Sequence, residues 1–108
     1  MNSRIRFLVP ALMLLSTALP VHADNHTVSQ VKKSFSVPVV KAKIGDTIEF
    51  RNDDDFAHNV FSLSDSQSFD LGSYKKGEVR SVKLATEGVI EVECAIHPDM
   101  KMKIEVKK

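Results

Sequence analysis

The chain has 108 residues, with 15 basic and 14 acidic side chains and a formal net charge of +1 at pH 7. This length fits one small domain, and the balanced charge excludes the concentrated basic surface that nucleic-acid binding needs. A domain of this size buries only about 60% of its unfolded surface, so a bound ligand that stabilises the folded state would help it.

The first 23 residues have the features of a secretory signal peptide. Two arginines precede an apolar run at residues 7–19, and Val21-His22-Ala23 provides a small-residue cleavage site. The run is shorter than the roughly 20 apolar residues that a membrane-spanning helix requires. We therefore expect residues 1–23 to be cleaved, leaving residues 24–108 as an exported, periplasmic domain without a membrane anchor.

The rest of the chain reads as short β-strands separated by turns. The expected strands cover residues 27–35, 37–44, 47–51, 79–84, 89–94 and 103–107, with apolar residues also at 60, 61 and 63 and a short apolar patch at 69–72. Asp53 to Asp55 is expected to be a solvated turn, and Tyr74 to Gly77 another turn. Short strands at this spacing, without helical periodicity, predict an all-β sandwich or barrel.

The expected strand at residues 89–94 places the only cysteine of the chain. Strict alternation puts Ile90, Val92 and Cys94 on one face, and Val89 with the glutamates on the other. Cys94 therefore ends its strand pointing into the core. With no second cysteine it forms no disulfide within the chain, so it is either a metal ligand or a buried, inert thiol.

Cys94 begins the segment Cys94-Ala95-Ile96-His97-Pro98-Asp99-Met100. A thiolate, an imidazole and a thioether on one short loop are soft donors that suit copper, and two His, one Cys and a weak axial Met form the blue-copper set. The second histidine is sought upstream, and His58 in Ala57-His58-Asn59-Val60 is the candidate.

These two segments together resemble the small cupredoxins of the amicyanin/plastocyanin type, over about residues 28–106. The resemblance implies a cupredoxin-like Greek-key β-sandwich that binds one type 1 copper ion. By the same resemblance His58, Cys94, His97 and Met100 are the copper ligands. Asn59 is then the residue that tethers the two ligand segments by hydrogen bonds.

The axial ligand has two candidates, Met100 and Met102. The first has the amicyanin-like spacing from Cys94, and the second has the plastocyanin-like spacing. In both types the axial Met is followed by one residue, Gly, Lys and an aliphatic residue. Lys103 and Ile104 fit that frame only if Met100 is the ligand, and Met102 then stands where the family usually has Gly.

The resemblance implies a function as well as a site. We expect a monomeric, non-enzymatic periplasmic protein that carries single electrons between redox partner proteins through Cu(I)/Cu(II), with the edge of His97 as the exit route. Ile96 and Pro98 flank this edge and would form an apolar docking surface. The alternative is a copper-binding or trafficking protein with the same ligands and a more open site, for which Met102 is a further candidate ligand. A cysteine hydrolase is disfavoured because no third group is evident to orient the base.

Two further patterns have competing interpretations. Lys75, Lys76, Lys101 and Lys103 form either a basic rim that steers an acidic partner or a set of solvated charges. Cleavage after Ala23 would leave Asp24-Asn25-His26 as a new amino terminus. A free amine with His at the third position forms a possible second Cu(II) site, against the alternative of a frayed terminus.

Overall fold

The computed structural model describes residues 22–108, so most of the expected signal peptide, residues 1–21, lies outside the described part. Nine strands make up the regular structure of the described residues. They are β1 (Asn25–Val31), β2 (Ser34–Phe35), β3 (Val39–Lys43), β4 (Thr47–Asn52), β5 (His58–Ser62), β6 (Phe69–Tyr74), β7 (Val79–Lys83), β8 (Gly88–Glu93) and β9 (Lys101–Lys107).

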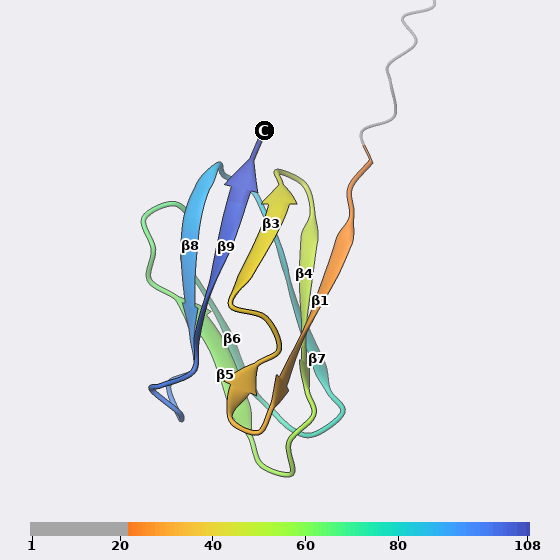
Figure 1. Ribbon diagram of the computed structural model, residues 1–108, viewed down its shortest axis with the longest axis vertical. Helices are drawn as coiled ribbons and strands as arrows, with labels where there is room; N and C mark the ends of the chain where they lie inside the picture. The colour runs from red at the N-terminus through yellow and green to blue at the C-terminus, as the bar shows by residue number, and fades with distance from the viewer. Residues whose placement is uncertain (1–21) are drawn as a thin grey trace, which may run out of the picture.

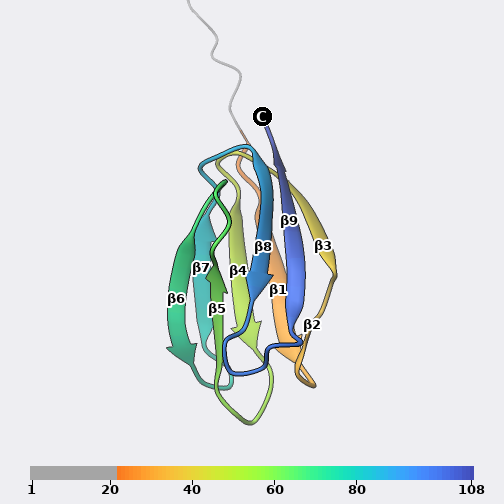
Figure 2. The ribbon, with the colours of Figure 1, turned by 90° about the vertical axis from the view of Figure 1, so that its left-hand side faces the viewer.

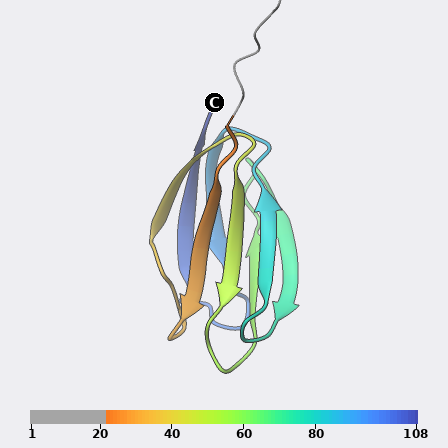
Figure 3. The ribbon, with the colours of Figure 1, turned by 90° about the vertical axis from the view of Figure 1, so that its right-hand side faces the viewer.

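The strands form two sheets that pack face to face, as Figure 1 and the turned views in Figures 2 and 3 show. One sheet has the order β2-β1-β4-β7 and the other β3-β9-β8-β5-β6. The β1–β4 and β3–β9 pairs are parallel, and the other pairs are antiparallel. This arrangement confirms the predicted β-sandwich. Among residues 22–108 there is no helix long and apolar enough to cross a membrane.

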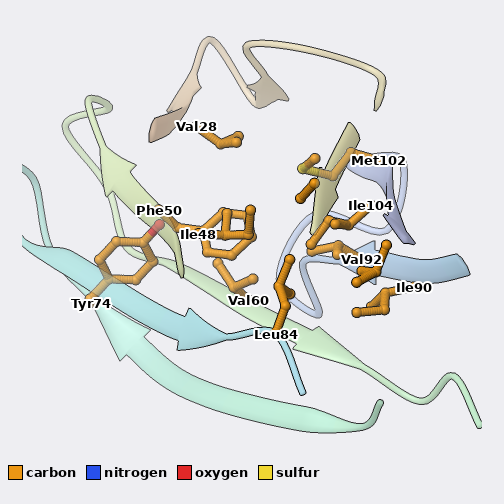
Figure 4. Packing of buried hydrophobic residues seen from close by; sticks show 12 residues of the cluster. Val28, Ile48, Phe50, Val60, Tyr74, Leu84, Ile90, Val92, Met102 and Ile104 are labelled. Carbon is orange, nitrogen blue, oxygen red and sulfur yellow. The ribbon is translucent and has the colours of Figure 1, made fainter. Parts of the chain in front are cut away.

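The core lies between the sheets, where side chains from alternate strand positions meet (Figure 4). The predicted alternation in β8 is confirmed, because Ile90 and Val92 are fully buried whereas Val89 is 50% exposed on the outer face. Cys94 directly follows β8 and is 1% exposed. The period of two therefore carries the thiol into the interior at one end of the sandwich.

Two segments differ from the strands expected from the sequence. The expected strand at 27–35 is divided by a tight hairpin at Lys32 and Lys33, whose φ angles of 53° and 57° turn the chain from β1 into β2. Tyr74, expected in a turn, is instead the last residue of β6 and is 1% exposed. Its hydroxyl donates a hydrogen bond to the buried Gln30 side chain, which explains how a polar ring end is held in the core.

The two ends of the sandwich carry different features. The β8–β9 loop with Cys94, the β4–β5 connection and the β1–β2 hairpin lie at one end (Figures 1 and 2). The start of β1 and the β3–β4 turn lie at the other end (Figure 3).

The β3–β4 turn contains a buried carboxylate, Asp46, which is 1% exposed. Its oxygens accept hydrogen bonds from the Asp24 and Lys43 backbone N–H groups and face His26 Nε2, all at 2.9 Å. The Asp24 N–H, the His26 ring and the Lys43 N–H hold the pKa of Asp46 well below its ordinary value, despite burial. The Asp24 backbone nitrogen and the His26 ring, two of the donors of the second Cu(II) site considered from the sequence, thus both contact Asp46, and that site stays a prediction.

The opposite faces of β8 give a matched test of the core. We expect Val92→Ala to lower the free energy of unfolding by about 2–3 kcal/mol, because it removes two buried methyl groups and leaves a cavity. Val89→Ala on the exposed face should change it by about 0.5 kcal/mol or less. Urea unfolding of both variants measures the difference, and equal losses would contradict the assigned register.

Asp46 should make stability depend on pH in the acid range. We expect Asp46→Asn to lower the free energy of unfolding by about 2 kcal/mol at pH 7, since a buried carboxylate with three donors is lost. The folded-state pKa lies below the unfolded value of about 3.9, so the stabilisation is complete above about pH 4 and is lost as the pH falls further. Unfolding curves from pH 3 to 7 measure it, with the exposed Asp65→Asn as control. The difference in unfolding free energy between the protein with Asp46 and Asp46→Asn should decrease in acid. A constant difference would contradict this explanation.

Candidate metal centre

Three potential ligands converge where β5 begins and β8 ends. Cys94 Sγ lies 3.7 Å from His58 Nδ1 and 3.8 Å from His97 Nδ1. The three ligand atoms all lie within 4.8 Å of one another, although His58 is 36 residues upstream of Cys94. Sheet pairing therefore brings together the two segments that the sequence singled out.

The separations between these atoms fit a first-row transition metal. Bonds of about 2.0 Å to nitrogen and about 2.3 Å to sulfur, meeting at about 120°, place the two atoms about 3.7 Å apart. The observed sulfur–nitrogen distances of 3.7 and 3.8 Å have this value. One thiolate and two imidazoles are also the donor set that copper prefers over harder cations.

Hydrogen bonds within the loop return Met100 to the vicinity of Cys94. The Met100 N–H donates to His97 O at 2.9 Å, and Met100 O accepts from the Cys94 N–H at 3.3 Å. Met100 is 1% exposed. Met102, the competing candidate, belongs instead to the hydrophobic core cluster and pairs with Val92 across the β8–β9 ladder (Figure 4).

A buried carboxylate orients His58. The ring of His58 is fully buried, and its Nε2 lies 2.7 Å from Asp54 Oδ2. A carboxylate acceptor at Nε2 places the ring proton there and leaves the Nδ1 lone pair directed at Cys94 Sγ. Asp54 therefore acts on the site through the histidine.

Asp54 corrects the expectation that Asp53 to Asp55 is a solvated turn. Asp54 is 8% exposed, and its oxygens accept hydrogen bonds from the Lys32 and Lys33 N–H groups at 2.7 and 3.1 Å. Burial opposes its charge, but the bonds from the His58 ring and these N–H groups outweigh burial and lower the pKa of Asp54. The sequence indicates this role only through a general rule: the ring nitrogen of a ligating histidine that does not bind the metal donates a hydrogen bond to an acceptor.

Asn59 joins the two ligand segments. Its Oδ1 accepts a hydrogen bond from the Ala95 N–H at 2.6 Å, directly beside Cys94. Its backbone oxygen accepts another from the Gln30 side chain at 3.3 Å. Asn59, which follows His58, is thus held by two hydrogen bonds. One of them also holds Ala95, which follows Cys94.

Phe56 is a site residue that the sequence analysis did not identify. Its ring centroid lies 5.2 Å from that of His58 and 5.3 Å from that of His97, and the two imidazole centroids are 4.9 Å apart. Phe56 is 40% exposed and Ile96 is 51% exposed, so apolar surface surrounds the half-buried His97. Burial, with smaller contributions from the charges of His58 and Lys33, lowers the pKa of His97 and favours its neutral, ligating form.

The lysines considered either as a basic rim or as solvated charges have acidic neighbours at two of the four positions. Lys76 Nζ lies 2.6 Å from Asp55 Oδ1, and Lys101 Nζ lies 3.7 Å from Glu93 Oε1. Lys33, which the sequence did not indicate, lies beside the site, with its Nζ 5.6 Å from the centroid of the Phe56 ring.

Comparisons with known proteins identify a family of copper-binding proteins. Residues 22–107 match the family of copper binding proteins described as the plastocyanin/azurin family. The methylamine utilization protein MauL of Methylorubrum extorquens is 33% identical over 109 residues, which cover 98% of this chain and 96% of that protein.

Solved structures show the same fold. A Cu(I) structure of an amicyanin variant superposes with a TM-score of 0.72 at 23% identity, covering 77% of this chain and 82% of the other. A copper-containing nitrite reductase from Thermus scotoductus also gives a TM-score of 0.72, at 27% identity, and covers 78% of this chain but 22% of the enzyme. The amicyanin match extends over most of both chains, whereas the reductase shares the fold in only one part of its length.

The contact between Asp54 and His58 can be tested by substitution. We expect Asp54→Asn to weaken copper binding by about 10–100-fold, because the carboxylate that fixes the ring orientation and raises its basicity is lost. Competition with a chromophoric Cu(I) chelator measures the affinity. Asp55→Asn is the matched control, since the Asp55 side chain is exposed and pairs with Lys76. Equal affinities for the two variants would contradict the role given to Asp54.

Proposed function

The chain belongs to the plastocyanin/azurin family of copper-binding proteins, and on this basis we propose that it is a type 1 copper protein that carries single electrons between redox partners in the periplasm. The observation that carries the proposal is the approach of Cys94 Sγ to two imidazole Nδ1 atoms at 3.7 and 3.8 Å inside a β-sandwich. When bound there, one copper ion supplies the Cu(II)/Cu(I) couple.

The ligand roles follow from the donor atoms and their surroundings. Cys94 binds as the thiolate, and His58 and His97 bind through Nδ1 in their neutral form. Met100 is the axial ligand in this proposal. Its backbone bonds to His97 and Cys94 keep it beside the site, whereas Met102 is used by the core.

Rigidity of the ligand set is what an electron carrier needs, since little rearrangement should accompany a change of charge. His58 is held by Asp54, and the Ala95 N–H is held by Asn59 Oδ1. Both ligand segments are attached to strands of the same five-stranded sheet. The protein thus holds the donors in one arrangement before and after electron transfer.

The surface beside His97 supports contact with a partner protein. Phe56 and Ile96 expose 40% and 51% of their surface there, and Pro98 borders the same region with His97 and Lys33 in a hollow of about 250 Å³. Apolar side chains around a ligand edge allow close, weakly held contact, as a transient redox encounter requires. We infer that electrons leave through the exposed edge of His97.

The location and processing form part of this proposal. The basic and apolar start of the sequence and the small residues at 21–23 support export and cleavage after Ala23. The exported domain would then be residues 24–108, acting as a monomer on separate donor and acceptor proteins. A single thiol survives in an oxidising compartment when it is buried and bound to metal.

The alternative of copper trafficking receives less support. A carrier that passes copper on needs an accessible site and an exchangeable ligand. Here His58 and Cys94 are 0% and 1% exposed, and Met102 is 3% exposed within the core.

Visible absorption tests the proposed function directly. We expect the processed protein with one equivalent of Cu(II) to show an intense thiolate-to-copper band, and Cys94→Ser to lack it, because the band requires the sulfur–copper bond. Rapid electron exchange between the two oxidation states should accompany the band. A colourless protein that binds copper and gives it to an acceptor would support trafficking instead, and failure to bind copper would refute both functions.

The two methionines provide a matched pair for the same measurement. Met100→Leu should shift the spectrum and the reduction potential, because an axial ligand tunes both. Met102→Leu should leave both nearly unchanged, at a cost in stability of less than about 1.5 kcal/mol. The reverse pattern would assign the axial position to Met102.

A further inference from the structure

A second site of interest lies at the end of the sandwich opposite the copper ligands (Figures 1 and 3). The backbone nitrogen of Asp24 donates to Asp46 Oδ1 at 2.9 Å, and Asp46 is 1% exposed. Asp24 is the residue that follows the small-residue sequence Val21-His22-Ala23. Peptide cleavage after Ala23 would therefore change the chemical nature of a nitrogen that already contacts a buried carboxylate.

The charged groups around Asp46 would accommodate an additional cation beside its carboxylate. Within residues 22–108, Asp46 makes no ion pair with a lysine or arginine, and its one ionisable contact is His26 Nε2 at 2.9 Å. Lys43 Nζ approaches the Asp24 side chain instead, at 3.6 Å from Oδ2. A buried carboxylate without a permanent cation is costly, so a further positive charge at this point would stabilise the fold.

Resting on the cleavage after Ala23 that forms part of the proposed function, we propose that the α-ammonium group released on Asp24 becomes the cationic partner of Asp46. Hydrolysis adds one water molecule across the Ala23–Asp24 bond. The departing segment keeps the Ala23 carboxylate, and Asp24 keeps the nitrogen as an ammonium group. The hydrogen bond to Asp46 then becomes an ion pair without movement of the nitrogen.

The local structure holds Asp24 in place independently of the residues before it. Asp24 O accepts a hydrogen bond from the Thr47 N–H at 3.0 Å, which aligns Asp24 with the start of β4. His22 and Ala23 are exposed and precede the first strand. Their removal gives up one exposed contact, from Lys43 Nζ to His22 O at 3.2 Å.

The position of the new amine matters to within one residue. A chain that begins at Ala23 retains the Asp24 N–H as an amide, and its charged amine lies about 3.8 Å further along the backbone. Such a chain keeps the hydrogen bond to Asp46 and loses the ion pair. It therefore separates the effect of charge from the effect of contact.

The first experiment is intact-mass analysis of the exported protein. The proposal expects a chain that begins at Asp24 and carries a free amine. A different first residue, or an acylated amine, would overturn it.

The second experiment compares the urea unfolding at pH 7 of two chains, residues 24–108 and residues 23–108, each in the form in which it is purified. We expect the folded-to-unfolded ratio of the chain beginning at Asp24 to be about tenfold higher, the size of a charge-assisted hydrogen bond. Introducing Asp46→Asn into both chains should remove this difference. Equal stabilities, or a difference that persists with Asp46→Asn, would overturn the proposal.

A titration of the Asp24 amine tests the proposal even if Asp46→Asn does not fold. Asp46 should raise the pKa of the Asp24 amine above its ordinary value of about 7.7–8.0, with Lys43 as the opposing charge, the Asp24 carboxylate as a further negative one and the His26 ring facing the same Asp46 carboxylate. The advantage of the chain beginning at Asp24 is then complete below about pH 8 and is lost as the pH rises through the folded-state value. An ordinary amine pKa, measured by NMR with labelled Asp24, would refute the ion pair. None of these readouts depends on copper.

Discussion

The structure depends on holding one thiol and two imidazoles together at one end of the sandwich, with Cys94 and His58 buried and His97 half-buried. Cys94 Sγ and the two Nδ1 atoms lie within 4.8 Å of one another, and Cys94 and His58 are 1% and 0% exposed. Buried polar groups must be oriented by neighbours, and the segments that carry His58 and Cys94 are. Asp54 holds the far side of His58, and Asn59 holds the residue after Cys94. The sandwich therefore acts as a frame that keeps the donor atoms in a geometry suited to a metal before the metal arrives.

That frame extends well beyond the ligands. The Lys32 and Lys33 N–H groups bind Asp54, so the β1–β2 hairpin of one sheet supports a histidine on the other. Gln30 in β1 contacts both Asn59 and Tyr74, and the latter is paired with His58 in the β5–β6 ladder. Buried side chains of one sheet thus fix the polar groups of the other, which makes the metal end of the sandwich a product of the whole fold.

The sequence predicted the parts of this arrangement that have a local pattern. Alternation around Cys94 located a buried thiol, and the loop spacing with His58 and Asn59 indicated the ligand segments. Asp54 could not be recognised in this way, because three consecutive acids suggest a solvated turn until a distant hairpin directs its N–H groups at the middle one. Phe56 was missed for a similar reason, since its contact with two histidines arises only when the loops meet. Burial of Tyr74 likewise depends on the acceptor that Gln30 provides.

The position of the last strand determines the order in which the molecule is completed. Strand β9 lies between β3 and β8, so the edge strand β3 is separated from the rest of the five-stranded sheet until β9 is in place. Such pairings between remote parts of a sequence form slowly, because a long loop must close first. The segment from Cys94 to Met100 connects β8 to β9 and is fixed at both ends only by this last insertion. A chain that ends before β9 therefore has the ligand residues but lacks the strand that fixes the loop between them, and we expect metal uptake to require this strand.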